Sequence, residues 1–122
     1  MKKILIIEDD DFLRSLAVTK LQKAGFSVTT AAAGEAGYDM AIADVPDLLL
    51  LDLMLPGMDG FTVLEKLRAH APTKTLKVII FSNLGDSADI KRGQDLGVVD
   101  FLVKASFTLD ELVEKISKVV GA

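Results

Sequence analysis

Short apolar runs alternate with amphipathic stretches along the whole chain. Five runs have the length and composition of strands, and they cover residues 3–7, 26–31, 48–51, 76–81 and 100–103. Five stretches with apolar residues at helical spacing follow them, at residues 12–24, 34–43, 60–70, 86–96 and 109–120. This strict alternation predicts an α/β fold, doubly wound, in which helices cover both faces of a parallel sheet.

The five predicted strands differ in hydrophobicity. The runs at 48–51 and 76–81 are almost continuously apolar, which is typical of strands buried on both faces. The run at 26–31 is more polar and the run at 100–103 is short, so these two are expected at the edges of the sheet. This distribution favours the strand order 2-1-3-4-5 of flavodoxin-like folds. Neither a linker nor an internal repeat divides the chain, so we expect one domain over residues 1–122.

The predicted helices carry recognisable start and stop signals. Gly25 is expected to end the first helix, and Asp59 to cap the third. Thr108 and Glu111 have the spacing of a capping box at the start of the last helix. The inward face of the first helix is expected to contain Leu13, Leu16, Ala17, Leu21 and Ala24.

The stretch at 86–96 has a thinner apolar face than the other predicted helices. Ile90 and Leu96 supply most of that face, and Gly93 interrupts it. Helix burial depends on such a stripe, so we expect this helix to be the least firmly docked.

Composition narrows the possible functions. The net charge of −4 argues against direct binding of nucleic acid, which favours basic surfaces. The chain has no cysteine, and this excludes disulfides and thiolate metal sites. The apolar run after Met1 is too short for a signal peptide, and no run has membrane-spanning length. We therefore expect a soluble cytoplasmic protein that has no contact with a membrane.

Polar residues stand at the carboxyl ends of four predicted strands, where parallel sheets bind ligands. They are Glu8, Asp9, Asp52, Ser82 and Lys104. Each has an ordinary explanation when considered alone: acidic residues favour helix N-termini, Asp and Ser favour turns, and most lysines are solvated. Their convergence on one edge of one sheet is more informative.

The three carboxylates among them predict a metal site. Carboxylates about 4 Å apart repel by roughly 4 kcal/mol at an effective dielectric near 20. A hard divalent cation, Mg²⁺ or Mn²⁺, relieves this repulsion, because such ions favour oxygen ligands. With the cation bound, Asp52 can act as a nucleophile toward phosphorus, while Ser82 and Lys104 stabilise charge on the phosphoryl oxygens.

Four motifs resemble those of the receiver domain of two-component response regulators, including single-domain chemotaxis regulators. They are ILIIEDD at 4–10, LLDLMLPGMDG at 50–60, VIIFS at 78–82 and DFLVK at 100–104. The resemblance implies a signalling switch, rather than an enzyme with a separate substrate, that takes a phosphoryl group from a sensor histidine kinase, a phosphotransfer protein or a small phosphodonor. It implies a downstream protein target, or an output domain if the chain is part of a longer regulator.

The same resemblance implies a role for each matching residue. Asp52 would be the phosphoacceptor, and Glu8 and Asp9 the acidic pair, with Asp9 a direct ligand of the metal and Glu8 acting through water. Met54 would contribute its backbone carbonyl to the metal. Lys104 would contact the phosphoryl group. The switch residues would be Ser82 and Phe101, which change the surface formed by the fourth helix, fifth strand and fifth helix.

Three departures from the family pattern lie next to these positions. Ala105 replaces the proline that usually follows the lysine, often after a cis bond. A cis bond before a residue other than proline costs about 3 kcal/mol, so a trans bond is favoured here. The placement of Lys104 is therefore left open. Asn83 is larger than the residue usually found after Ser82. Met54 and Leu84 stand at positions that are often polar, so we expect slow loss of the phosphoryl group.

Three alternatives use the same type of sheet. A phosphatase of the haloacid dehalogenase type would need a second Asp two residues after Asp52, where Met54 stands. A flavin or nucleotide binder would need a Ser-, Thr- or Gly-rich loop after the first strand, where residues 8–11 are acidic. A degenerate receiver would bind partners constitutively, without phosphorylation.

Overall fold

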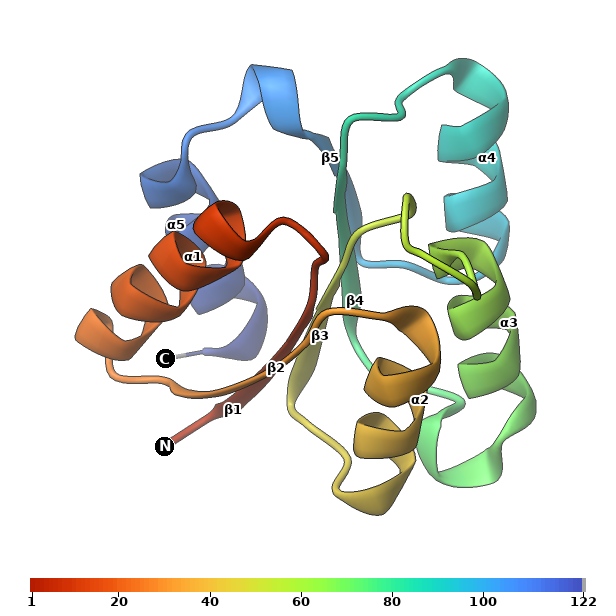
Figure 1. Ribbon diagram of the computed structural model, residues 1–122, viewed down its shortest axis with the longest axis horizontal. Helices are drawn as coiled ribbons and strands as arrows, with labels where there is room; N and C mark the ends of the chain where they lie inside the picture. Colours follow the sequence, from red (N-terminus) through yellow and green to blue (C-terminus); the bar gives the residue numbers. More distant parts are fainter. Residues whose placement is uncertain (122) are drawn as a thin grey trace.

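Five parallel strands form the centre of the molecule, with helices on both faces (Figure 1). The computed structural model describes residues 1–121. The strands are β1 (Lys3–Ile7), β2 (Ser27–Ala31), β3 (Leu48–Leu51), β4 (Val78–Ser82) and β5 (Asp100–Val103). The α-helices are α1 (Asp11–Lys23), α2 (Gly34–Ala43), α3 (Gly60–Ala69), α4 (Ser87–Asp95) and α5 (Leu109–Val120), and the short 3₁₀ helices are η1 (Ala71–Thr73) and η2 (Lys104–Ser106). The order β2-β1-β3-β4-β5 and the all-parallel pairing confirm the predicted fold class.

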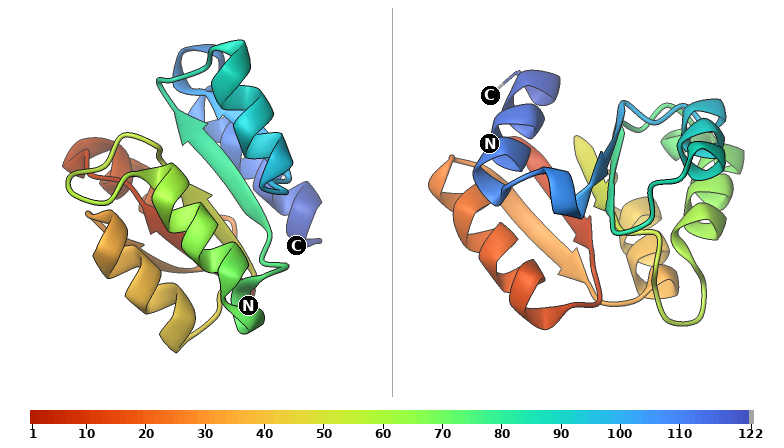
Figure 2. Two further views of the ribbon diagram at one scale, coloured as in Figure 1. Left: turned by 90° about the vertical axis from the view of Figure 1, so that its right-hand side faces the viewer. Right: turned by 90° about the horizontal axis from the view of Figure 1, so that it is seen from above.

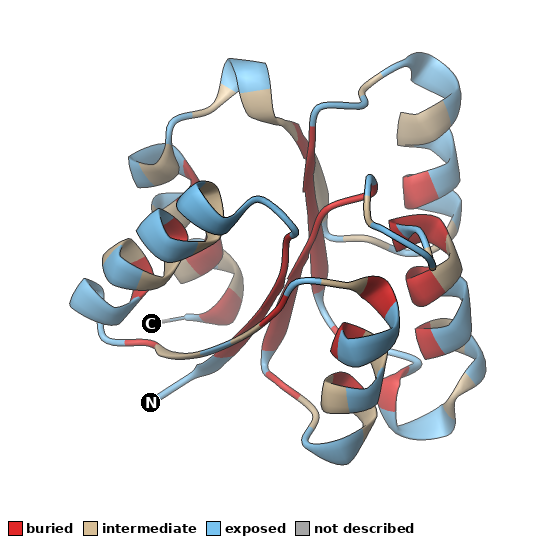
Figure 3. Ribbon diagram, viewed as in Figure 1, coloured by how far each residue is buried: buried red, intermediate tan, exposed pale blue. Residues whose placement is uncertain are grey.

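The helices form two layers around the sheet. Helices α1 and α5 cover one face, and α2, α3 and α4 cover the other (Figures 1 and 2). Successive residues of a strand point to opposite faces, so Leu48 and Leu50 join the core under α1 and α5, while Leu49 and Leu51 join the other core. The central strands are therefore buried on both sides (Figure 3), which explains their continuous apolar sequence.

The first helix buries a narrower face than its sequence predicts. Ala17 and Leu21 are buried, but Leu16 is 38% exposed. Leu16 lies about 100° around the helix from Ala17, given 3.6 residues per turn, and this places it at the margin of the apolar stripe. Ala24 was also predicted to face inward, but it is exposed because the helix ends at Lys23. Gly25 follows Ala24, the C-cap residue of α1, and has φ +94°, as expected for a glycine that ends a helix.

Other boundaries agree closely with the sequence pattern. Asp59 caps α3 by accepting a hydrogen bond from Thr62, and the capping box of Thr108 and Glu111 is present at α5. Strand β4 begins at Val78, two residues later than predicted, and includes Ser82 as its last residue.

Helix α4 has the thin apolar face that its sequence predicts. Gly93 is its single buried residue within the described part of the chain, whereas each other α-helix buries at least two. Every helix within residues 1–121 is too short or too polar to span a bilayer.

Candidate functional site

The site lies at the edge of the sheet where the strands have their carboxyl ends. Two buried carboxylates stand there. Glu8 and Asp52 directly follow β1 and β3, and their residues are only 4% and 5% exposed. The backbone N–H of Glu8 donates to Ala31 at 3.0 Å, and that of Asp52 donates to Ile7 at 3.0 Å. The sheet therefore continues one residue past each strand and fixes the position of both acidic residues.

A third carboxylate completes an acidic cluster. Oxygen atoms of Glu8, Asp9 and Asp52 lie within 4.8 Å of one another, and Asp9 is the exposed member of the three. An all-oxygen donor set that is open to solvent on one side fits Mg²⁺, which keeps several water ligands in protein sites. The structure thus brings together the predicted carboxylates in an arrangement that fits the predicted metal.

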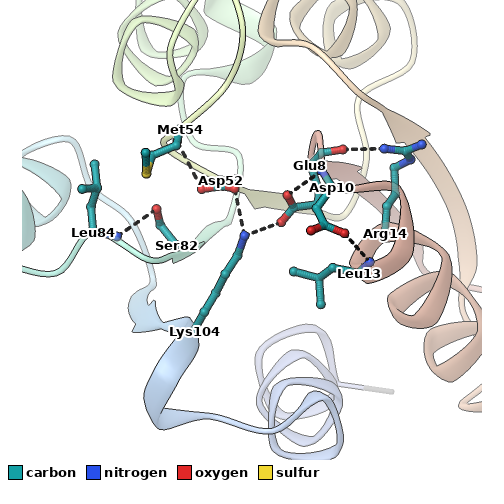
Figure 4. Close-up of polar contacts among 9 residues, drawn as sticks. All are labelled: Glu8, Asp10, Leu13, Arg14, Asp52, Met54, Ser82, Leu84 and Lys104. Atoms are coloured by element: carbon teal, nitrogen blue, oxygen red, sulfur yellow. Dashed lines mark hydrogen bonds and ion pairs between the residues drawn. The ribbon is translucent and has the colours of Figure 1, made fainter.

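Lys104 lies between the two buried carboxylates (Figure 4). Its Nζ donates to Asp52 Oδ2 at 2.9 Å and lies 2.7 Å from Glu8 Oε1. No peptide bond within residues 1–121 is cis, so Lys104 reaches the site with a trans bond to Ala105. Although no proline follows Lys104, its ammonium group is in contact with Asp52, the candidate phosphoacceptor.

Burial and hydrogen bonding shift two pKa values in the site. Burial raises the pKa of Glu8 above its ordinary value, and the hydrogen bonds from Lys104 and from the Asp10 N–H offset this only in part. Burial alone would lower the pKa of Lys104, but hydrogen bonds to Glu8 and Asp52 outweigh it and raise the pKa. Lys104 is therefore held as an ammonium ion at neutral pH.

The predicted switch residues lie on the neighbouring strands. Ser82 is fully buried, and its hydroxyl accepts a hydrogen bond from the Leu84 N–H at 3.3 Å. Phe101 is half-buried on β5, and a Cβ placed on Gly93 would lie 3.1 Å from its ring. The ring of Phe101 thus packs against α4 where a glycine leaves space.

The residues that flank the mouth of the site are largely apolar. The Met54 N–H donates to Asp52 Oδ1 at 3.2 Å, while its side chain is mostly exposed. Leu84 is 38% exposed and Asn83 is also exposed. Slow loss of a phosphoryl group remains a prediction from this composition.

One residue of the site was missed by the sequence analysis. Arg14 of α1 donates from Nη1 to the backbone carbonyl of Glu8 at 2.9 Å (Figure 4). It also pairs with Asp11. The only signal in the sequence was the spacing, since a long side chain one turn into a helix can reach back over the loop before it.

Comparisons with known proteins agree with this geometry. A family model described as the response regulator receiver domain matches residues 4–117. The chain is 39% identical over 116 residues to the DNA-binding dual master transcriptional regulator RpaA of Synechocystis, covering 95% of this chain and 48% of RpaA. It is 38% identical over 102 residues to the response regulator PleD of Caulobacter vibrioides, covering 84% of this chain and 22% of PleD. The chain therefore spans less than half the length of these curated relatives.

Solved structures show the same fold over nearly the whole chain. A response regulator from Chloroflexus aurantiacus is 33% identical, with a TM-score of 0.88 and coverage of 99% of this chain and 98% of that one. The receiver domain of the sensor histidine kinase PA1611 from Pseudomonas aeruginosa is 25% identical, with a TM-score of 0.87 and coverage of 99% and 98%. That structure has a magnesium ion coordinated in its active site cleft.

Fold and site together define a phosphoacceptor signalling domain of two-component systems. The chain belongs to the response regulator receiver domain family. This membership does not favour the phosphatase or constitutive-binding alternatives.

Proposed function

We propose that Asp52 accepts a phosphoryl group from the phosphohistidine of a sensor kinase or phosphotransfer protein, or from a small phosphodonor. The main support is the environment of its carboxylate. Asp52 is buried beside two other carboxylates and 2.9 Å from the Lys104 ammonium. Such a carboxylate is fixed in place and can be approached from the exposed side, where Asp9 lies.

The reaction forms one bond and breaks one bond. A carboxylate oxygen of Asp52 attacks phosphorus, and the phosphorus–nitrogen bond to the donor imidazole breaks as the ring nitrogen takes the electron pair. Glu8, Asp9, Asp52 and the backbone carbonyl of Met54 would hold Mg²⁺ or Mn²⁺. When bound, the ion would supply positive charge that stabilises the transferring phosphoryl group. Lys104 would donate a hydrogen bond to a phosphoryl oxygen, and its Nζ already lies beside the Asp52 carboxylate that forms the new bond.

Ser82 and Phe101 would change position when Asp52 is phosphorylated. The Ser82 hydroxyl accepts from Leu84 and retains its own proton, which it can donate to a phosphoryl oxygen. Movement of Ser82 would let the Phe101 ring turn inward and shift α4, which has few buried side chains to hold it. The surface formed by α4, β5 and α5 would then change.

The partners follow from this role. We propose that residues 1–122 form one receiver domain, located in the cytoplasm, that is loaded by a sensor kinase or phosphotransfer protein. Its output would be contact with a downstream protein or with an attached output domain, rather than direct binding of nucleic acid by this domain.

Acetyl phosphate and Mg²⁺ provide the direct test. We expect intact mass spectrometry to show one phosphoryl adduct on the wild type and none on Asp52→Asn. Asp110→Asn is a matched control, because Asp110 is an exposed carboxylate of α5 that pairs with Lys20. It should be labelled as the wild type is.

Two outcomes would contradict this proposal. One is a wild type that acquires no adduct, and the other is an adduct that persists in Asp52→Asn. Continuous release of phosphate from a phosphomonoester by the wild type, abolished in Asp52→Asn, would support a phosphatase instead.

A further inference from the structure

Arg14 ties the start of α1 to the loop that carries the acidic pair. Its Nη1 donates to the Glu8 carbonyl at 2.9 Å, and its Nη2 pairs with the Asp11 carboxylate. The side chain of Arg14 is only 21% exposed, whereas that of Asp11 is 89% exposed. The guanidinium is thus packed against the loop, and the two planar donor groups fix its direction.

The contact with Glu8 fixes one peptide group at the centre of the site. The Glu8 N–H is held by Ala31 on β2, and its carbonyl is held by Arg14. The bond from Arg14 therefore restrains the peptide between Glu8 and Asp9, and the bond to Ala31 restrains the peptide before it. The side chains of Glu8 and Asp9 extend from the Cα atoms at the two ends of the Glu8–Asp9 peptide. Its orientation decides whether the two carboxylates face Asp52.

Other contacts of the loop restrain the residues that follow. The Asp10 N–H donates to Glu8 Oε2 at 3.1 Å, and Asp10 Oδ1 accepts from the Leu13 N–H at 2.9 Å. Arg14 also lines a small cavity, together with Glu8 and Asp52. The Arg14 side chain therefore reaches from α1 to the backbone of Glu8, next to the acidic cluster (Figure 4).

The charge of Arg14 and its effect on the orientation of the loop should change the affinity for Mg²⁺ in opposite directions. A cation on the loop that carries the acidic pair weakens the attraction of the cluster for Mg²⁺. A loop that is already held in the ligand geometry strengthens binding, because less order must be imposed when the ion arrives. The sign of the effect of removing Arg14 therefore reveals which influence dominates.

We propose that Arg14 is a positioning residue for the divalent cation: it orients the Glu8–Asp9 peptide without contacting the ion or the phosphoryl group. This inference rests on the proposed function, because it takes Glu8, Asp9 and Asp52 as the metal ligands. Residues that orient metal ligands typically contribute a factor of about 10–100 to metal affinity.

Calorimetric titration of metal-free protein with Mg²⁺ tests this proposal. We expect Arg14→Gln to raise the Kd for Mg²⁺ about tenfold, although the substitution removes a positive charge. Arg14→Lys keeps the charge but loses the planar set of donors, so its Kd should lie between those of Arg14→Gln and the wild type. Lys20→Gln is the matched control, since it removes the same charge from the same helix at an exposed pair with Asp110 and should leave the Kd unchanged.

A second measurement separates positioning from general damage. In labelling by acetyl phosphate, Arg14→Gln should raise the Mg²⁺ concentration needed for half-maximal rate about tenfold while the rate at saturating Mg²⁺ is retained. If Arg14→Gln does not fold, as shown by urea unfolding, Arg14→Lys alone carries the test.

The outcomes distinguish the two proposals. Unchanged or tighter Mg²⁺ binding in Arg14→Gln, or in Arg14→Lys if only that variant folds, overturns the role of Arg14 and leaves the proposed function intact. A wild type that does not bind Mg²⁺, or that binds it equally well after Asp9→Asn, overturns the assigned metal site and the role of Arg14 with it.

Discussion

At the scale of residues, the site contains more negative charge than its own cations neutralise. Glu8 and Asp52 are both nearly buried, and a single ammonium, that of Lys104, lies between them. The raised pKa of Glu8 shows that the charge of this carboxylate is disfavoured in the folded protein, mainly by burial. In the absence of metal, an ionised Glu8 therefore lowers the stability of the fold.

Glu8→Gln should stabilise the metal-free protein at pH 7. The pKa of Glu8 is raised in the folded state, so the stability associated with its proton is present below the ordinary value of 4.5 and is lost as pH rises through the folded-state pKa. Glutamine has no charge to lose. Thermal unfolding in a chelating buffer should give a midpoint a few degrees higher for Glu8→Gln at pH 7, and the difference should shrink toward pH 4.5.

Glu114→Gln is the control for this comparison. Glu114 is an exposed carboxylate of α5 that pairs with Lys118, and such pairs contribute roughly 0–1 kcal/mol. A lower midpoint for Glu8→Gln at pH 7 would show that the Lys104–Glu8 ion pair outweighs the cost of burial. A difference that does not depend on pH would show that folding leaves the pKa of Glu8 unshifted.

The sequence predicts the strand-end residues of the site for a simple geometric reason. Parallel strands end at the same edge, so the positions of Glu8 and Asp52 in the sequence are enough to bring them together. The contact of Lys104 with both carboxylates is shown by the structure, because the sequence left its placement open. The place of Arg14 could not be predicted in this way. The direction of an arginine side chain depends on its rotamer and on the loop that it meets, and neither is visible in a periodic pattern.

At the scale of elements, two arginine side chains help to attach α4. Arg68 of α3 donates to five backbone carbonyls that lie beyond the end of α4 and before β4, namely those of Leu96, Gly97, Thr73, Lys74 and Leu76. Arg92 of α4 lies 4.2 Å from the centre of the Phe61 ring and 3.4 Å from Glu65. Arg68 anchors the C-terminal end of α4, far from Ser82, so a shift of the N-terminal end is the easier movement.

Arg68→Ala should lower the free energy of unfolding by about 2–3 kcal/mol. The substitution removes charged donors from carbonyls that are partly buried, and a hydrogen bond to a charged group contributes about 1.5–3 kcal/mol. Urea denaturation measures the change. Lys66→Ala, on the same helix, removes only a cation–π contact with Tyr38 and should cost about 1 kcal/mol or less. A loss no larger for Arg68→Ala than for Lys66→Ala would show that water replaces the lost donor.

The existence and type of every α-helix and strand could be predicted, but the attachment of α4 could not. The spacing of apolar residues indicates which face of a helix is buried, and α4 has few such residues. Its sequence therefore predicted weak docking, but it did not indicate which other contacts hold the helix. The anchor comes from α3, and Arg68 has no periodic signal of its own. The exposure of Leu16 is a second case, because the width of a buried stripe depends on the neighbouring elements.

At the scale of the whole molecule, one sheet separates two apolar cores. Ile116 of α5 packs in one core, and Tyr38 of α2 borders the other. Both cores include alternate residues of the same strands, so neither can be lost while the other is kept. This sharing supports the proposal that residues 1–122 form a single cooperative domain.

Ile116→Val should test that cooperativity. Removing one buried methylene lowers the free energy of unfolding by about 1 kcal/mol. Tyr38 is the single tyrosine and the chain has no tryptophan, so tyrosine fluorescence reports the opposite core from the substitution. Fluorescence and far-ultraviolet circular dichroism should shift to lower urea concentration together. Separate transitions would show that the two sides of the sheet unfold independently.

The strand order also has a consequence for the chain as it is synthesised. The first three strands to emerge are spatial neighbours, but the outer edge of β3 has no partner until β4 appears. That edge belongs to Leu48–Leu51, an apolar segment whose unpaired backbone can pair with another nascent chain. At roughly 5–20 residues per second, translation from Leu51 to Val78 takes a few seconds. During those seconds on the ribosome, the future centre of the sheet is its most aggregation-prone edge.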